Sequence, residues 1–326
     1  MKFSISLFQS RTNGQSERTI YSQSLEQIRL AEALGFHAAW FTEQHFNDFG
    51  VCPDPLTFSA HLAGATKTIR LGTAVVLLSI HNPVVLAERA ALVDQLSEGR
   101  LDLGIGKGHS KLNYGAFGIS SEENEARFYE AHDLMIAAWA GEEFSFHGKF
   151  FDVEKIRIVP RPFQSPHPPL WVASFGNPAS IGFAARNAYP LLHSFSGDGL
   201  QKNLELYLSQ YSGTAKPVIA IARAIHLDED GDRARREMVE PTRWFIDNNP
   251  GRPAQILSYE LAINQFLNTI GIVGSVEECI EQIRILQVEH GVEYMALIFG
   301  QGGLAHEKIL AAMRLFAEKV MPEFVN

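Results

Sequence analysis

The chain of 326 residues contains only two cysteines, Cys52 and Cys279. This number excludes a disulfide framework and a cysteine metal site, and it favours a reducing, cytoplasmic setting. Long hydrophobic runs are also missing, since no stretch approaches the roughly 20 apolar residues that a membrane helix needs. The short N-terminal run Lys2–Phe8 is expected to form a buried strand rather than a signal peptide.

Positive charge is scarce as well. The sequence has 28 Lys and Arg against 37 Asp and Glu, a net charge of -9, which argues against a nucleic-acid partner. The histidines form no metal-binding pair with a carboxylate, and no Gly-x-Ser-x-Gly elbow is present. A hydrophobic content of 46% is that of a globular protein with a large core, and no membrane partner is predicted.

Short β-rich runs alternate with helical patterns along the whole chain. Apolar runs such as Thr73–Leu78 are typical of parallel strands that are buried on both faces. Strands are predicted at Lys2–Phe8, Phe36–Phe41, Arg70–Leu78, Arg100–Gly106, Leu170–Ser174, Leu191–Phe195, Val218–His226 and Tyr294–Phe299. Helices are predicted between them, the first of them over Ser24–Leu34.

About eight β/α units predict a single (β/α)8 barrel domain over residues 1–326. A doubly wound open sheet is the alternative, but it calls for a glycine fingerprint after the first strand that this chain lacks. Two insertions, at about 144–169 and 248–274, interrupt the alternation. We expect both at the C-terminal face of the barrel, where active sites form. The first insertion is rich in phenylalanine.

The best catalytic candidate is His45, which follows the second strand together with Glu43 and Gln44. Its position places the imidazole at the active face of a barrel, and its ordinary pKa near neutrality suits proton transfer. Glu43 is a candidate to orient the ring. The alternative is a histidine that only caps a loop.

Two further segments are candidates for binding an anion. Gly106 and Lys107 follow the fourth strand, where glycine admits a close ligand and lysine supplies a point charge. The junction Ser174–Ser180, with Phe175 and Gly176, opens a helix whose free amides would attract an anion. A solvated lysine and an ordinary capped helix are the alternatives.

Three other residues have open roles. Phe8 and Phe195 end strands, where they either line an aromatic pocket or belong to the core. Arg223 interrupts the apolar strand Val218–Ile225, and burying a cation there is unfavourable without a partner. It either binds substrate or pairs structurally.

Several strings in this order resemble one family of flavin enzymes, the bacterial luciferase-like monooxygenases. The strongest are Thr42–Phe46 and Asp94–Gly108, supported by Ala33–Phe36, Arg70–Ala74 and His81–Val84. The resemblance runs from Met1 to about Ser196, with a weaker echo in Gly271–Phe324.

The resemblance implies a barrel that binds reduced FMN (FMNH2) at its mouth, or the deazaflavin F420 in one branch. It also implies a dimer. The flavin ring would lie over Ala74 and Val75, where relatives often have a non-prolyl cis peptide. The phosphate would meet Lys107 and the Ser174–Ser180 junction, and His45 with Gln44 would face the reacting side of the ring.

Two departures from the luciferase catalytic chain matter. Gln44 stands where that chain has its catalytic histidine, so light emission is not expected. Gly106 replaces a cysteine, and Lys107 replaces the usual arginine, which keeps the charge but loses the two-pronged geometry.

The resulting hypothesis is a two-component monooxygenase that uses FMNH2 from a separate NAD(P)H-flavin reductase, together with O2, to oxygenate a small organic substrate. An apolar or aromatic substrate would suit the phenylalanine-rich insertion. An F420-dependent oxidoreductase and a non-catalytic flavin-binding subunit of a heterodimer are the alternatives.

Overall fold

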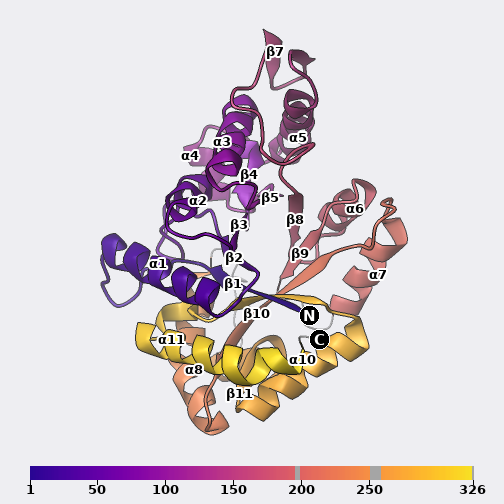
Figure 1. Ribbon diagram of the computed structural model, residues 1–326. Coiled ribbons are helices and arrows are strands. Elements are labelled where there is room, and N and C mark those ends of the chain that lie inside the picture. The colour runs from indigo at the N-terminus through magenta and orange to yellow at the C-terminus, as the bar shows by residue number, and fades with distance from the viewer. Residues whose placement is uncertain (195–198, 250–257, 325–326) are drawn as a thin grey trace.

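The protein folds into a closed barrel of parallel strands surrounded by helices (Figure 1). The computed structural model describes residues 1–194, 199–249 and 258–324. Eight strands of this described part follow one another around the barrel, and the pairing of β10 with β9 closes it, so the predicted (β/α)8 fold is confirmed. In order around the barrel they are β1 (Lys2–Leu7), β2 (Ala38–Phe41), β3 (Arg70–Thr73), β5 (Leu101–Gly106), β8 (Leu170–Ser174), β9 (Leu191–Ser194), β10 (Ile219–Leu227) and β12 (Tyr294–Ile298).

Helices form the outer layer of the barrel. Those of the first half are α1 (Glu17–Ala33), α2 (Pro55–Ala63), α3 (Pro83–Leu96), α4 (Lys111–Ala116), α5 (Asn124–Ala140) and α6 (Pro178–Arg186). Those of the second half are α7 (Leu200–Gln210), α8 (Gly231–Asn248), α9 (Tyr259–Gln265), α10 (Val276–His290) and α11 (His306–Leu315). Short helical turns are η1 (Leu78–Ile80), η2 (Phe266–Ile270), η3 (Gln301–Gly303), η4 (Phe316–Val320) and η5 (Met321–Glu323). Two short strands, β4 (Val76–Leu77) and β11 (Ile272–Gly274), extend the sheet beside β5 and β10.

Aromatic side chains fill the interior of the barrel. The ring centroids of Trp40 and Trp171 lie 5.0 Å apart, and those of Trp171 and Tyr294 lie 5.7 Å apart. Gly72 makes room for this packing, because a Cβ atom there would lie 2.2 Å from Cε3 of Trp40. Because side chains fill the interior, a ligand can bind only at the ends of the strands.

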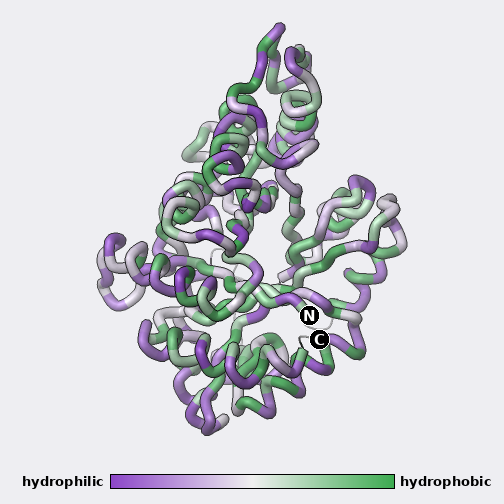
Figure 2. The backbone as a smooth tube through the Cα atoms, in the orientation of Figure 1, coloured by the Kyte–Doolittle hydropathy of each residue, from purple (hydrophilic) through white to green (hydrophobic). Residues whose placement is uncertain are grey.

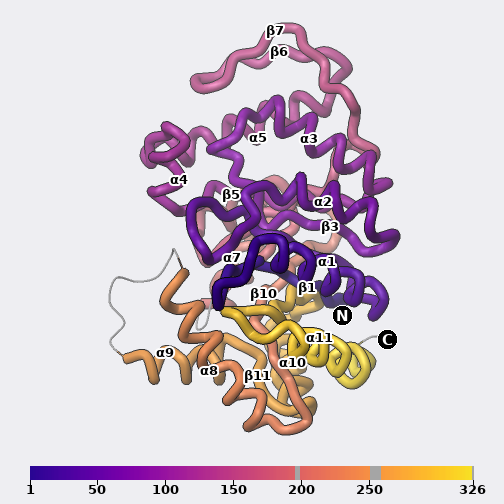
Figure 3. Tube along the Cα trace, turned by 90° about the vertical axis from the view of Figure 1, so that its left-hand side faces the viewer, coloured from indigo at the N-terminus to yellow at the C-terminus, as the bar shows by residue number. Residues whose placement is uncertain are grey.

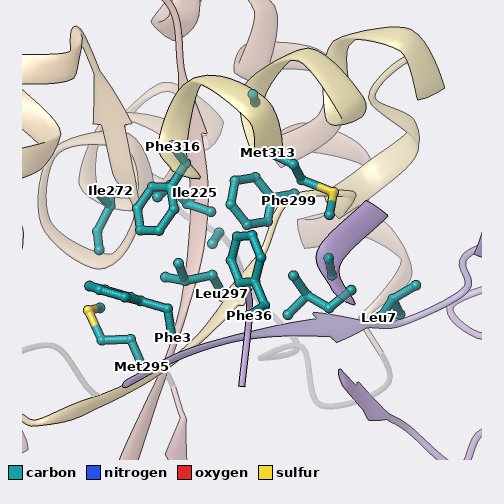
Figure 4. Packing of buried hydrophobic residues seen from close by; sticks show 14 of the residues in the cluster. Phe3, Leu7, Phe36, Ile225, Ile272, Met295, Leu297, Phe299, Met313 and Phe316 are labelled. Atoms are coloured by element: carbon teal, nitrogen blue, oxygen red, sulfur yellow. The ribbon is translucent and has the colours of Figure 1, made fainter. Parts of the chain in front are cut away.

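A second layer of the core lies between the strands and the helices around them. In Figure 4 the rings of Phe36, Phe299 and Phe316 meet between β1, β12 and α11. The ring centroids of Phe3 and Phe316 are 5.1 Å apart, and the two rings meet edge to face. This geometry stabilises an aromatic pair by more than the buried area alone contributes. Figure 2 shows hydrophilic and hydrophobic residues alternating along the surrounding helices, as amphipathic helices require.

Side-chain caps set the starts of most outer helices. Helix α1 begins at Glu17, earlier than the predicted Ser24, because the Ser16 hydroxyl accepts a hydrogen bond from the Thr19 amide. The first turns of α1 are mostly polar, with Ile20 as their one buried residue, so no apolar repeat reveals them. Helices α3, α6 and α10 likewise follow the capping side chains of Asn82, Asn177 and Ser275.

The placement expected for the first insertion is wrong. The hairpin of β6 (Phe144–His147) and β7 (Asp152–Ile156) follows α5 and precedes β8, so it lies at the N-terminal end of the strands. Gln164, which follows the hairpin in the chain, confirms this placement, because its side chain donates a hydrogen bond to Leu101 O at the start of β5. Figures 1 and 3 show the hairpin beyond α3 and α5. The phenylalanine-rich insertion therefore does not line the barrel mouth.

The second insertion is described in part. Residues 250–257 lie outside the described residues, and the remainder forms the end of α8, α9, η2 and β11. Strand β11 pairs in parallel with the C-terminal part of β10, where Ile225 lies opposite Ile272. This places it beside the strand ends that form the mouth.

The described residues contain no helix that is both long and apolar enough to span a membrane. Cys52 and Cys279 are buried free thiols, and burial raises the pKa of each to about 12.

Candidate active site

A buried carboxylate ties two histidines together at the barrel mouth. Oε1 of Glu43, just beyond β2, lies 2.8 Å from Nε2 of His45 and 2.8 Å from Nε2 of His81. Its Oε2 accepts a hydrogen bond from the Leu77 amide at 2.9 Å. Burial raises the pKa of Glu43, but the hydrogen bonds from both histidines outweigh it, and the pKa ends below its ordinary value. Glu43 is therefore an ion at neutral pH.

The ionised carboxylate fixes the protonation of both rings. A carboxylate only accepts hydrogen bonds, so each Nε2 must carry the hydrogen that it donates. In the neutral ring, Nδ1 of His45 is then the atom that keeps a lone pair and accepts a proton. The structure thus brings Glu43 and His45 together, as predicted.

The third predicted residue of this group, Gln44, is directed elsewhere. Its side chain packs over Gly50, where a Cβ atom would lie 2.7 Å from Cγ of Gln44. It lines a surface hollow with His45 and Arg11, whose guanidinium is held by Glu17 and Asp48. Gln44 is close to His45 but takes no part in the carboxylate cluster of the described residues.

Two aromatic rings stand over His45. The ring centroid of Phe117 lies 5.0 Å from that of His45, and the centroids of Phe46 and Phe117 lie 5.6 Å apart. Phe46 is 59% exposed and Phe117 is 41% exposed, which is unusual for such large apolar side chains. Phe46 also has a left-handed backbone, with φ of 61°. This combination points to an apolar wall beside the imidazole.

Small residues make the adjoining floor of the site. The peptide bond between Ala74 and Val75 is cis, as in the family that the sequence resembles, and the Ala74 amide donates to Phe41 O at 2.6 Å. A Cβ atom on Gly106 would lie 2.6 Å from Cγ2 of Val75, so only glycine fits beneath that side chain. Three predicted binding residues, Ala74, Val75 and Gly106, therefore lie together.

Lys107 is paired in this structure. Its Nζ lies 2.8 Å from Oε1 of Glu125, and this hydrogen bond lowers the pKa of the glutamate. The Glu125 side chain is half exposed, and exposed ion pairs contribute little to stability. An incoming phosphate can therefore replace Glu125 as the partner of Lys107 with only a modest loss of stability.

The predicted anion site at the Ser174–Ser180 junction needs a correction, because its amides are not free. The Ser174 hydroxyl accepts from the amides of Gly176 and Asn177, each at 3.1 Å. Asn177 Oδ1 accepts from the amides of Ala179 and Ser180. An anion would have to displace these caps, or bind the side chains of Ser180 and Asn177 instead. Phe175, in the same loop, is 67% exposed.

Arg223 does not face the barrel mouth. Ala220 and Ala222 belong to the interior cluster, so the alternation of a strand places Arg223 outside the barrel wall. It is buried, its Nη1 donates to Ala222 O, and burial lowers its pKa to about 10. No carboxylate in the described part of the chain pairs with it. Of the two roles left open for Arg223, substrate binding at the mouth is therefore not supported.

The two terminal phenylalanines have different outcomes. Phe8 packs on Phe49 and Phe245, with ring centroids 5.3 and 6.3 Å away, near the mouth. Phe195 lies outside the described residues.

Sequence reasoning missed His81 as a site residue. The only available signal was its place in the string His81–Val84, which supported the family resemblance and suggested no contact. Its partner Glu43 is 38 positions away, so local patterns do not reveal the pairing. The wall formed by Phe46 and Phe117 was missed for the same reason.

Comparison with known proteins identifies the family. A family model described as luciferase-like monooxygenase matches residues 1–293, so the chain belongs to this family. The oxygenase component of a flavin-dependent trigonelline monooxygenase from Acinetobacter baylyi is 28% identical over 348 residues, which cover 99% of this chain and 96% of that protein. An uncharacterised protein of Sinorhizobium fredii is 36% identical over 187 residues, or 57% of this chain, and the match spans about half of its length, 53%.

Solved structures agree on the fold. The monooxygenase RslO1 from Streptomyces bottropensis superposes with a TM-score of 0.91 at 30% identity and covers 100% of both chains. The oxygenating constituent of 3,6-diketocamphane monooxygenase from Pseudomonas putida, solved with FMN, has a TM-score of 0.85 at 19% identity, covering 100% of this chain and 99% of that one.

Proposed function

We propose that this chain is the oxygenase component of a two-component, FMNH2-dependent monooxygenase. A separate NAD(P)H-flavin reductase would supply the reduced flavin, and O2 would be the second substrate. The observation that carries the proposal is the Glu43–His45–His81 cluster, which lies beside the small-residue floor of Ala74, Val75 and Gly106 at the barrel mouth.

The residues present fit a flat, polar-edged ring. The floor offers a surface without bulky side chains, and the Thr42 hydroxyl beside Glu43 is buried without a partner among the described residues. An orphaned hydroxyl of this kind indicates that a bound group supplies the missing hydrogen bond. Lys107, which directly follows Gly106, is the predicted cation for a phosphate tail, once Glu125 has moved aside.

The protein's own residues would hold and protect the reacting groups. The flavin, when bound, supplies the redox chemistry with O2. Glu43 holds His45 so that Nδ1 accepts or returns a proton at the reacting group, and His81 helps to keep Glu43 in place. Phe46 and Phe117 exclude water on that side and favour an apolar or aromatic substrate.

The first test is anaerobic titration with FMNH2 and, in a separate arm, with reduced F420. The bound species is then mixed with oxygenated buffer in a stopped-flow instrument. We expect FMNH2 to bind and to react with oxygen on a different time course from free FMNH2. His45→Ala should alter that time course, whereas His147→Ala, on the exposed far hairpin, serves as the control.

Two outcomes would replace the proposal. Binding of reduced F420 without FMNH2 binding would make the protein a hydride-transferring oxidoreductase. An obligate heterodimer whose activity His45→Ala leaves unchanged would make it a non-catalytic flavin-binding subunit.

We also propose that the protein is a homodimer in a reducing, cytoplasmic setting. Val85, Leu92 and Leu96 on α3 are 49%, 47% and 54% exposed, and their spacing places them on one helix face. Light scattering after size-exclusion chromatography checks this, and a monomeric mass at working concentration would contradict it.

A further inference from the structure

A surface hollow at the barrel mouth is lined in part by His45. It has a volume of about 460 Å³, which is within the range of sites that bind small molecules. Its walls come from the loop after β1, the first residue of α1 and the loop after β2. His45 belongs both to this hollow and to the Glu43 cluster, so a molecule bound in the hollow lies beside the proposed proton-transferring ring.

Hydrogen bonds hold the walls of the hollow in place. The Arg11 amide of the first loop donates to Asp48 O of the second at 2.8 Å. Asn47 braces the second loop, because its side chain donates to His45 O at 2.7 Å and accepts from the Phe49 amide at 3.0 Å. A ligand therefore meets a preformed surface, and binding requires little further ordering of the protein.

The charged side chains of the hollow carry an excess of negative charge. Among the described residues, Arg11 contributes one positive charge to the lining, and Glu17 and Asp48 contribute two negative charges, which leaves a net charge of −1. Oε1 of Glu17 accepts from Nη1 of Arg11 at 2.6 Å, and Oδ1 of Asp48 accepts from Nε at 2.8 Å. Oε2 of Glu17 and Oδ2 of Asp48 accept no hydrogen bond from the described residues. Both side chains are about half exposed, so these oxygens are open to a ligand.

An imidazole nitrogen without a partner belongs to the same lining. His45 is only 8% exposed. Its Nε2 bonds to Glu43, whereas its Nδ1 forms no hydrogen bond in the described part of the chain and is not fully enclosed by protein. An unpaired polar atom on a side chain so deeply buried indicates that a bound molecule supplies the missing contact. This observation is independent of the two carboxylates.

The hollow also has an apolar part. The Phe46 ring lines it together with Val51 and Pro53, and Phe46 is 59% exposed. The face of an aromatic ring attracts a positive charge, and its carbon surface suits an apolar group. The lining therefore fits a molecule that has both a charged end and an apolar or aromatic body.

The balance of charge decides the sign of the charged end. Arg11 has five N–H groups and keeps some of them free to bind an anion. A bound anion, however, brings the count to three negative charges against one positive, whereas a bound cation balances two against two. The Coulomb interactions therefore favour a cation.

We propose that this hollow binds the substrate as an organic cation, a protonated amine carried on an aromatic or apolar group. The ammonium group donates to the open oxygens of Glu17 and Asp48, and the apolar group packs on Phe46. The inference rests on the proposed function only for the role of this cation as the substrate. Binding of the cation is a property of the hollow itself.

The test compares three probes that share a phenyl ring and differ in charge. Benzylammonium is positive, benzyl alcohol is neutral and benzoate is negative. In NMR titrations of the flavin-free protein at low ionic strength, we expect benzylammonium to bind roughly threefold to tenfold more tightly than benzyl alcohol, and benzoate to bind most weakly. About 0.5 M NaCl should remove most of this preference. Equal binding of benzylammonium and benzyl alcohol, or tighter binding of benzoate, would overturn the proposal.

The imidazole signals locate the bound probe. Benzylammonium should shift the nitrogen resonances of His45, which lines the hollow. It should leave His132 unchanged, because that ring is buried on α5 and both of its nitrogens already have partners. A bound probe that leaves His45 unchanged lies elsewhere, and the proposal would then be wrong.

Two charge-removing variants test the carboxylates. Asp48→Asn and Glu17→Gln keep an oxygen that accepts from Arg11, and each should weaken benzylammonium binding roughly threefold to tenfold without changing benzyl alcohol binding. Glu26→Gln is the control, because Glu26 is on the same helix as Glu17 but pairs with His306 and does not line the hollow. Wild-type affinity for benzylammonium in both variants would contradict the proposal. If a variant fails to fold, the salt dependence and the His45 signals of the wild type still decide.

A separate titration with FMNH2 distinguishes this inference from the proposed function. Selective binding of benzylammonium without binding of FMNH2 would refute the monooxygenase and keep the cation site. Binding of FMNH2 without any preference for benzylammonium would keep the monooxygenase and refute the cation site.

Discussion

Replacing Glu43 by glutamine should disturb the site more than its small change in shape suggests. The carboxylate accepts from His45 and His81 at Oε1 and from the Leu77 amide at Oε2. A carboxamide has one acceptor and one donor. If its oxygen faces the histidines, its NH2 group opposes the Leu77 N–H. If its oxygen faces Leu77, both histidines must give up the hydrogen on Nε2.

The structure sets the size of the expected effect. At least one hydrogen bond to a charged acceptor is lost and one buried donor is left without a partner, so Glu43→Gln should lower the free energy of unfolding by about 3–6 kcal/mol. General acid–base catalysis contributes roughly a hundredfold to ten-thousandfold, so activity that depends on His45 should fall within that range.

The pH dependence has a defined sign. The folded pKa of Glu43 lies below its ordinary value of 4.5. Glu43 therefore contributes stability that is fully present above that value and is lost as the pH falls through the folded pKa. Glu43→Gln should remove this part of the acid-induced loss of stability.

Two assays check the reasoning without a known substrate. Urea denaturation gives the free energy of unfolding, and nitrogen NMR of the imidazoles reports which nitrogen of His45 is protonated. Glu123→Gln is the control, because Glu123 forms only an exposed helix pair with Arg127. If Glu43→Gln keeps the wild-type stability and leaves the hydrogen on Nε2 of His45, the cluster does not organise the site as described.

Substitutions at four further positions test other parts of the structure. His81→Leu should destabilise the protein by roughly 1.5–3 kcal/mol in urea denaturation, because it removes a donor to a buried carboxylate, and His81→Gln should recover much of this. Gly106→Ala should weaken FMNH2 binding in titration and lower stability by about 1–3 kcal/mol, because its Cβ would meet Val75 at 2.6 Å. Lys107→Ala should weaken FMNH2 binding but scarcely change the melting temperature, because its ion pair is exposed. Arg223→Met should raise the free energy of unfolding by about 1–4 kcal/mol in urea denaturation, and a fall would contradict the view that burying this cation is unfavourable.

The sequence predicts the barrel well because the relevant signals are local. Continuous apolar strands, glycine stops and side-chain caps recur in most β/α units, and the order of these units closes the barrel. The wrong prediction of where the hairpin Phe144–Ile156 lies has a different cause. Composition marked the segment as an insertion, and only its place between α5 and β8 assigns it to the N-terminal end. The start of α1 was missed because its first turns are mostly polar, and the buried Ile20 alone makes no apolar repeat.

The site is harder to predict because its key contacts join distant residues. Glu43 and His81 are 38 positions apart, and Phe46 meets Phe117 from a different β/α unit. The Ser174–Ser180 junction shows the opposite problem. Its residues were identified, but the same polar side chains that attract attention in the sequence already satisfy the amides thought to be free.

These contacts divide the mouth into chemically distinct parts around His45. One nitrogen of the imidazole is bound to an ionised, buried glutamate, and the ring face meets the exposed side chains of Phe46 and Phe117. Nδ1 is therefore the nitrogen of His45 that is left to exchange a proton with a bound group, while the apolar wall limits competing water.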